Sequence, residues 1–230
     1  TLKSGRILLI YTQFYGGAAD ESAARLAGIY SDDCGRTWSA PKTILENEAG
    51  NNVMSVSLLR LRSGRIAMFY LRKNSWLDCR PYLLVSTDEA VTWSQPRLVV
   101  EAPGYFVLNN DRVVQLGTGR LIVPVAFHRS RAEDPKSSRS FDGRGIAIWY
   151  YSDDEGQSWR EADIWWALPT PSAAGLQEPG VVELADGRLW SWARTDQGTQ
   201  VGFISMDAGK SWTAPAPTSL ESPLSPASIV

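Results

Sequence analysis

Charged and amide side chains cluster at points of this sequence where apolar runs of strand length begin or end. Groups of this kind bind a small polar ligand when several of them converge in one hollow. The candidates are the carboxylates Asp20, Asp111 and Glu178, the amides Asn52 and Asn110, the guanidinium groups Arg72 and Arg194, and the imidazole of His128. Loops are polar in most proteins, so a solvated loop side chain is the alternative interpretation of each.

Four copies of the pattern Ser-x-Asp-x-x-x-[Thr/Ser]-Trp indicate which elements must position these groups. They begin at Ser31, Ser86, Ser152 and Ser205, and a period of about 53 to 66 residues is typical of an array of supersecondary units. Ser and Asp side chains hydrogen-bond the backbone of a turn, and the closing Trp buries apolar surface beneath it. The pattern therefore predicts a structural turn with a buried Trp, least regular in the second copy, which has Ala90 where the others have Gly.

A second repeat precedes each copy, because a Gly-Arg pair interrupts an apolar stretch at Gly5-Arg6, Gly64-Arg65, Gly119-Arg120 and Gly187-Arg188. Apolar runs on both sides of such a pair predict a tight hairpin. A third strand leads into each Ser-x-Asp turn and a short fourth strand follows it. Each unit is then a four-stranded antiparallel blade, so the predicted fold class is an all-β propeller.

Residues 1–230 are predicted to form one propeller region. Its four blades are residues 1–48, 49–104, 105–172 and 173–220, and residues 221–230 enter a further blade. In this topology the Gly-Arg and Ser-x-Asp turns lie on one face and the polar candidates lie on the opposite face, around the propeller axis. Two interpretations of the chain ends stay open. The favoured one is a fragment of a larger propeller; the other is a four-bladed ring in which residues 225–230 supply the missing inner strand of the first blade.

Composition excludes several classes of protein. A hydrophobic content of 43% and a charged content of 21% indicate a folded globular chain without a membrane segment. The net charge of -2 gives no electrostatic case for binding nucleic acid. Cys34 and Cys79 are not expected to pair, and a single histidine without zinc spacing argues against a metal site. No metal or organic cofactor is expected, and the compartment is open, with a secreted or periplasmic location favoured.

The Ser-x-Asp turns match the Asp-box, or bacterial neuraminidase repeat. Together with the Gly-Arg hairpins they cover nearly the whole chain, which resembles the sialidase superfamily of six-bladed propellers. The resemblance implies a retaining exo-glycoside hydrolase that releases terminal sialic acid or a related sugar from a glycan. It implies no cofactor.

Three residues match sialidase positions individually. Glu178 resembles the inner-strand Glu that deprotonates a Tyr nucleophile, and Arg194, at the end of the next strand, resembles one of three arginines that hold the substrate carboxylate. Asp20 lies in the loop where sialidases keep the acid that protonates the leaving group and then activates water. A carboxylic acid held partly out of water keeps its proton more readily and can donate it, and the sequence does not show how buried Asp20 is. A solvated carboxylate at Glu178 and a structural salt bridge at Arg194 are the alternatives.

The rest of the family's constellation would lie outside the chain, with one Arg before Thr1 and a further Arg and the Tyr after Val230. Two alternatives to a sialidase therefore stay open. One is a non-catalytic carbohydrate-binding or scaffolding propeller. The other is a propeller glycosidase for a neutral sugar, with Asp111 or Asp142 as a carboxylate.

Overall fold

The computed structural model describes residues 1–131, 133–139, 141–222 and 224–229, and it is all-β. Within these ranges the chain forms strands, turns and bends but no helix, so none of the described segments is a helix that could cross a membrane. Val230, the last residue of the predicted lead into a further blade, lies outside the described residues.

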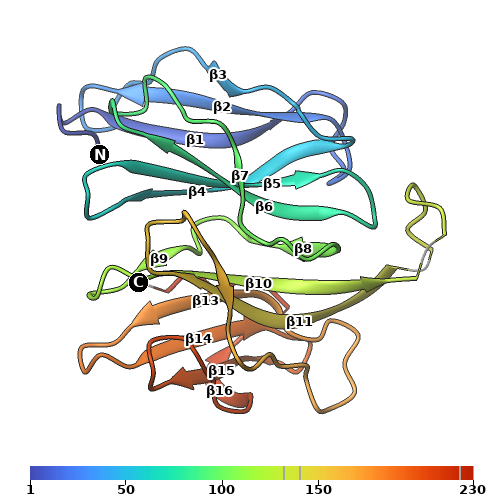
Figure 1. The fold of residues 1–230 in the computed structure, drawn as a ribbon. Coiled ribbons are helices and arrows are strands. Elements are labelled where there is room, and N and C mark those ends of the chain that lie inside the picture. The colour runs from blue at the N-terminus through green and yellow to red at the C-terminus, as the bar shows by residue number, and fades with distance from the viewer. Residues whose placement is uncertain (132, 140, 223, 230) are drawn as a thin grey trace.

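The strands form three antiparallel groups that follow the order of the chain (Figure 1). The first sheet contains β1 (Ile7–Phe14), β2 (Ala24–Ser31) and β3 (Lys42–Leu45). The last contains β13 (Gln177–Glu183), β14 (Leu189–Arg194), β15 (Thr199–Ser205) and β16 (Ala216–Glu221). The nine strands between them are β4 (Asn52–Arg60), β5 (Ile66–Lys73), β6 (Cys79–Ser86), β7 (Arg97–Leu98), β8 (Tyr105–Val107), β9 (Val114–Gln115), β10 (Leu121–Ser130), β11 (Phe141–Ser152) and β12 (Arg160–Glu161).

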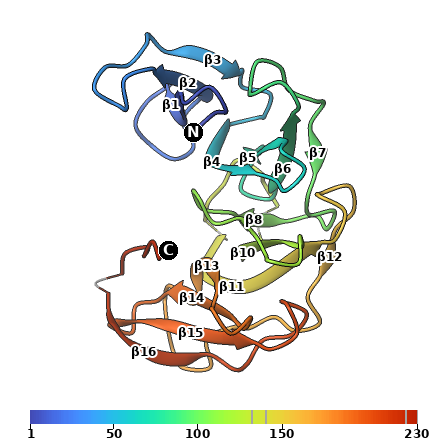
Figure 2. The same cartoon turned by 90° about the vertical axis from the view of Figure 1, so that its left-hand side faces the viewer.

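The sheets differ from four separate four-stranded units in two ways. The first sheet has three strands, and β4 to β12 form one nine-stranded sheet because Cys79 of β6 pairs in parallel with Tyr105 of β8. The sheets follow an arc that does not close (Figure 2). Residues 224–229 form no strand, and the indole of Trp192 donates a hydrogen bond to the carbonyl of Ala227 in this segment. The segment therefore does not provide a fourth strand to the first sheet.

The four predicted Gly-Arg turns are present and share one hydrogen-bond pattern. In each, the Gly amide donates to the carbonyl of a leucine three residues earlier, and that leucine's amide donates to the carbonyl of the Arg. All four glycines have φ between 83° and 97°, a left-handed conformation in which L side chains are strained. The sequence prediction of a tight turn at these points is confirmed.

The four Ser-x-Asp turns also share one pattern. In the first, Ser31 Oγ donates to Asp33, while the Gly35 amide donates to Ser31 Oγ and the Thr37 amide to Asp33. The carboxylate accepts several hydrogen bonds, which lowers the pKa of Asp33 to about 2. The second copy makes the same bonds, with the Ala90 amide 2.9 Å from Ser86 Oγ, so the expectation of a less regular turn is wrong. Ala90 adopts φ 67° in place of a glycine.

The closing tryptophans are not equally buried, which corrects the prediction of four buried indoles. Trp212 is 3% exposed and stacks on Trp149, with ring centroids 4.5 Å apart. Trp93 and Trp159 are half-buried, and Trp38 is 40% exposed. The difference follows from packing between sheets. Trp93, Trp159 and Trp212 each join a hydrophobic cluster, whereas Trp38 belongs to none of the clusters among the described residues.

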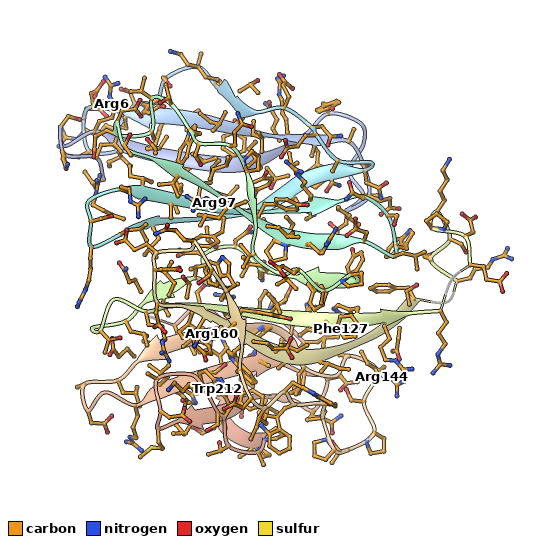
Figure 3. The ribbon with its side chains drawn as sticks, viewed as in Figure 1. Arg6, Arg97, Phe127, Arg144, Arg160 and Trp212 are labelled. Carbon is orange, nitrogen blue, oxygen red and sulfur yellow. The ribbon has the colours of Figure 1, made fainter. Side chains whose placement is uncertain are left out.

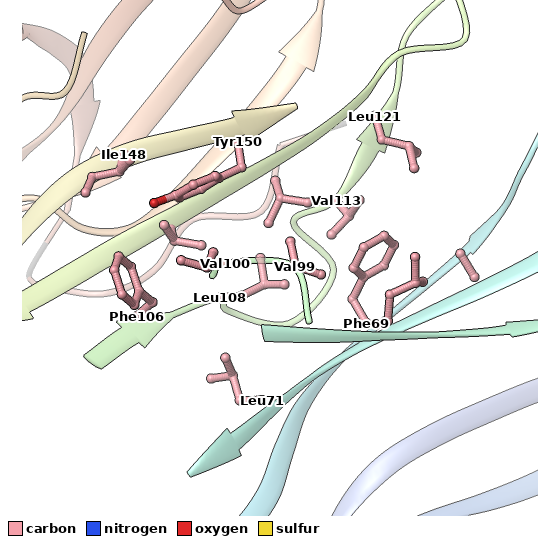
Figure 4. Packing of buried hydrophobic residues seen from close by; sticks show 14 of the residues in the cluster. Phe69, Leu71, Val99, Val100, Phe106, Leu108, Val113, Leu121, Ile148 and Tyr150 are labelled. Carbon is pink, nitrogen blue, oxygen red and sulfur yellow. The ribbon is translucent and has the colours of Figure 1, made fainter. Parts of the chain in front are cut away.

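The hydrophobic core consists of three clusters that follow one another along the molecule, rather than one central cluster. One cluster joins the first sheet to β4–β6, a second joins β5 and β6 to β8–β11, and a third joins β10 and β11 to β13–β15. Figure 4 shows the second, in which the ring of Phe69 from β5 points toward Val99 and Val113. Buried apolar surface between the groups therefore fixes the relative positions of the strand ends that carry the polar residues.

The two kinds of turn lie together at one end of the strands, and their side chains brace each other. Arg6 of the first Gly-Arg turn pairs with Asp32 at 2.7 Å, and Arg120 of the third pairs with Asp153 at 2.6 Å. Figure 3 shows Arg6 near this end and Arg144 toward the opposite end. The end that carries Arg144 is therefore free of these turns.

Candidate functional site

A cleft of about 410 Å³ lies at the end of the strands opposite the turns. All three groups contribute to its wall, which includes the loop between β1 and β2, the ends of β5 and β10, and the adjoining ends of β13 and β14. Four of the candidates named from the sequence line it, namely Asp20, His128, Glu178 and Arg194. Residues far apart in the sequence thus converge in one hollow with two carboxylates and a guanidinium group.

Glu178 is directed by an irregularity in β13. Gln177 pairs with Arg194 and Gly180 pairs with Trp192, so Glu178 and the proline after it lie opposite a single residue of β14. Glu178 has φ 49°, a left-handed conformation that is uncommon for a residue with a side chain. Bulges of this kind re-aim side chains next to functional sites, and such strain persists only where the surrounding structure holds it.

Glu178 and Arg194 form an ion pair within the cleft. Arg194 Nε lies 3.0 Å from Glu178 Oε2, and both side chains are 21% exposed. Neither atom makes a well-directed hydrogen bond to the described residues, so the contact is mainly electrostatic. Arg194 also donates to the side-chain oxygen of Gln177 and to the carbonyl of Leu224, at 3.4 Å for the latter.

Opposing effects act on the Glu178 carboxyl. Burial raises its pKa, the positive charges of Arg194 and Arg112 lower it, and nearby Asp20 raises it, with a net upward shift. Arg112 is itself buried, its Nε has no hydrogen-bond partner among the described residues, and burial lowers its pKa. The cleft thus holds a carboxylate that gains a proton more readily than an ordinary glutamate, close to two arginines.

Asp20 lies at the rim of the cleft, in the loop between β1 and β2. It is exposed, because it lies in an open loop rather than on a packed strand. Asn52, expected to bind a ligand, is 0% exposed and donates instead to the backbone carbonyls of Asp20 and Ser22, at 2.7 and 2.8 Å.

Aromatic rings form one wall of the cleft. Trp76 stacks on Tyr105 at 6.0 Å and meets Phe141 edge-on at 5.0 Å. His128 stacks on Phe141 at 5.2 Å, and its Nδ1 lies 3.2 Å from the carbonyl of Asp142. Burial lowers the pKa of His128, which favours the neutral ring. This wall offers apolar surface, while the carboxylates and Arg194 offer hydrogen bonds.

The other sequence candidates do not line the cleft. Arg72 pairs with Glu48 and lies over the ring of Tyr82, 4.1 Å from its centroid. Asn110 and Asp111 are exposed in the turn before β9. The Asp111 amide donates to the carbonyl of Val56 in β4, so this turn lies against the second group of strands, and the roles of Arg72, Asn110 and Asp111 in binding a ligand stay predictions.

Asp142, the alternative carboxylate for a neutral sugar, pairs with Arg144 at 2.7 Å and lines a neighbouring hollow. The ion pair lowers the pKa of Asp142 to about 2.

Sequence reasoning missed the aromatic wall and the buried Lys73. Trp76, Tyr105 and Phe141 come from three separate segments, and only the fold brings them together. Lys73 lies next to Arg72 at the end of an apolar run, and nothing in the sequence signals that it is buried. The bulge at Glu178 had one signal, the Pro-Gly pair that follows it.

A larger hollow of about 970 Å³ lies at the opposite end, among the first two Ser-x-Asp turns. Its carboxylates are committed to structure, since Asp33 holds its own turn, Asp32 pairs with Arg6 and Glu89 pairs with Arg60. The cleft is therefore the better candidate for a functional site, although it is the smaller of the two.

The fold and the cleft define a class of protein, the sialidase-like all-β proteins with repeated Ser-x-Asp turns. The BNR repeat-like domain matches residues 5–230. The chain belongs to this BNR-repeat family, within the sialidase superfamily.

Two curated relatives share part of the sequence. A sialidase of Micromonospora viridifaciens is 25% identical over 205 residues, which is 79% of this chain and 30% of that protein. An anhydrosialidase of Macrobdella decora is 29% identical over 164 residues, 65% of this chain and 19% of that protein. The chain thus spans less than a third of either relative.

Solved structures share the fold. A Hadza microbial sialidase superposes with a TM-score of 0.73 at 19% identity, over 97% of this chain and 47% of that one. The intramolecular trans-sialidase of Ruminococcus gnavus gives a TM-score of 0.69 at 17% identity, over 95% and 69%. A protein of unknown function from Dyadobacter fermentans gives 0.71 at 19% identity, over 96% and 67%.

Proposed function

We propose that residues 1–230 form four blades of a six-bladed propeller, and that the protein is a sialidase-like exo-glycosidase. Its substrate is a glycan that ends in sialic acid or a related sugar. The observation that carries the proposal is the convergence of Asp20, Glu178 and Arg194 in one cleft. The curated relatives support it, because their names are those of a sialidase and an anhydrosialidase.

In this proposal Arg194 binds the carboxylate of the sugar. A planar guanidinium group matches a carboxylate through two parallel hydrogen bonds, which a lysine cannot provide. Arg194 is partly exposed in the cleft, and its Nη1 makes only a long contact of 3.4 Å with the Leu224 carbonyl, which a ligand carboxylate can replace. The aromatic wall of Trp76 and Phe141 then packs against the apolar parts of the sugar.

Asp20 protonates the leaving-group oxygen as the glycosidic bond breaks and later takes a proton from the attacking water. A sugar bound in the cleft would cover Asp20 and remove water from it. Glu178, as in the family, accepts the proton of a tyrosine nucleophile supplied from outside residues 1–230. The sugar is bound covalently to that tyrosine between the two steps, so configuration at the anomeric carbon is retained.

Titration with an acidic sugar tests the binding part of the proposal. The full-length protein should bind sialic acid more tightly than its methyl ester, and Arg194→Met should remove this preference. The lost charge-assisted contact is worth about 1.5–3 kcal/mol, or roughly 10- to 150-fold in Kd. Tryptophan fluorescence gives the readout, because Trp76 lines the cleft.

The matched control is Arg144→Met, which removes an arginine outside the cleft and should leave the preference unchanged. Equal affinity of the wild-type protein for the acid and its ester would mean that no carboxylate is bound. A neutral-sugar glycosidase or a binding propeller would then replace the proposal.

A further inference from the structure

We propose that Asn52 and Lys73 form a clamp that holds the loop of residues 15–23, and with it Asp20, in position for proton transfer. The inference rests on the proposed function and adds two positioning residues to it. Neither side chain needs to touch the substrate, since both act through the backbone of the loop.

The clamp is a cross-strand pair. Asn52 begins β4, and Lys73, the last residue of β5, lies directly opposite in the antiparallel register. The Asn52 amide donates to the carbonyls of Asp20 and Ser22, at 2.7 and 2.8 Å, and Lys73 Nζ donates to the carbonyl of Asp20 at 3.2 Å. The Asp20 carbonyl therefore accepts from both members of the pair.

Both clamp residues are buried at a cost that the fold alone does not require. Asn52 is 0% and Lys73 is 3% exposed, and lysine is almost never buried to this degree unless it is paired. Asn52 Oδ1 has no hydrogen-bond partner among the described residues. Instead of a carboxylate, Lys73 Nζ faces the rings of Trp76 and Tyr105, at 4.8 and 5.7 Å from their centroids.

Among the described residues, the other backbone hydrogen bonds of the loop are internal to it. The amides of Tyr15 and Gly16 donate to the Ala23 carbonyl, and the Ser22 amide donates to the Ala19 carbonyl, all within the loop itself. The loop includes two glycines, and Asp20 is exposed. The clamp is thus the main attachment of the loop to the second group of strands, which carries the aromatic wall of the cleft.

Positioning of an acid should affect substrates unequally. In the full-length protein, Asn52→Leu and Lys73→Met should lower kcat/KM at least about tenfold for a sialoside with a sugar leaving group, because small misplacements of a catalytic group are costly. The ratio kcat/KM covers the steps up to cleavage of the glycosidic bond. An aryl sialoside with an acidic phenol needs no proton donor in those steps, so its kcat/KM should change less than about threefold.

A second variant and a control separate loss of the clamp from loss of folding. Asn52→Asp keeps the shape of the side chain and can pair with Lys73, yet it cannot donate to the loop, so it should show the same split without loss of folding. Gln115→Leu removes an amide that donates to a backbone carbonyl at the opposite end of the molecule. Any effect of Gln115→Leu on kcat/KM should be the same for both substrates.

Amide hydrogen exchange tests the clamp independently of catalysis. Exchange at Ser22 should rise at least about tenfold in Asn52→Leu and Asn52→Asp, while the amides of β1 and β2 stay protected. Unchanged exchange, or an equal fall in kcat/KM on both substrates, would overturn the clamp. If the wild-type protein cleaves no sialoside, the proposed function fails, and the exchange at Ser22 still decides whether the clamp exists.

Discussion

Asp20→Asn should lower kcat/KM for a sialoside with a sugar leaving group by about 10²–10⁴-fold, the usual contribution of a general acid. The amide keeps the shape of the side chain but cannot act as the acid that protonates the leaving oxygen. An aryl sialoside whose leaving group is a stable phenolate should lose much less in kcat/KM. Steady-state kinetics of the full-length protein on both substrates measure the difference.

The matched control is Glu21→Gln, which removes the neighbouring carboxylate from the same cleft wall. It should leave the ratio between the two substrates unchanged. A similar fall in kcat/KM on both substrates for Asp20→Asn would assign Asp20 a structural role instead.

Trp212→Ala should lower the free energy of unfolding by about 3–5 kcal/mol, the usual cost of truncating a buried aromatic residue. The indole of Trp212 is buried and stacked on Trp149 in the cluster between β10, β11 and β13–β15. Trp38→Ala changes the same position of the first Ser-x-Asp turn, where the indole is 40% exposed, and should cost less than about 1–2 kcal/mol.

Denaturant unfolding of the two tryptophan variants gives both values. Equal costs would mean that the indoles act through their own turns, and that packing between the sheets contributes little to the difference.

The turns could be predicted from the sequence because their physics is local. A Gly at the left-handed position and Ser and Asp side chains that bond nearby amides suffice to form them. Burial of the tryptophans could not be predicted, because it depends on which sheet packs against each turn. The pairing of Cys79 with Tyr105, which joins two predicted units into one sheet, is likewise a tertiary contact.

For the candidate site, the sequence predicted which residues come together but not how their side chains are oriented. The predicted topology and the family resemblance identified Asp20, His128, Glu178 and Arg194 as candidates at strand ends. The structure places all four in one cleft. The sequence does not show in which direction a side chain points or which groups it contacts. In the structure Arg72 pairs with Glu48, and Asn52 donates to backbone carbonyls instead of facing a ligand.

Proton NMR of the sugar as it is released tests the central claim most directly. The full-length protein, incubated with a sialoside that carries a sugar leaving group, should first release free sialic acid as the α-anomer, which then converts to the β-anomer. Asp20→Asn should release almost none. No release by the wild-type protein, the β-anomer formed first, or an anhydro sugar in place of the free sugar would contradict retaining hydrolysis at this cleft.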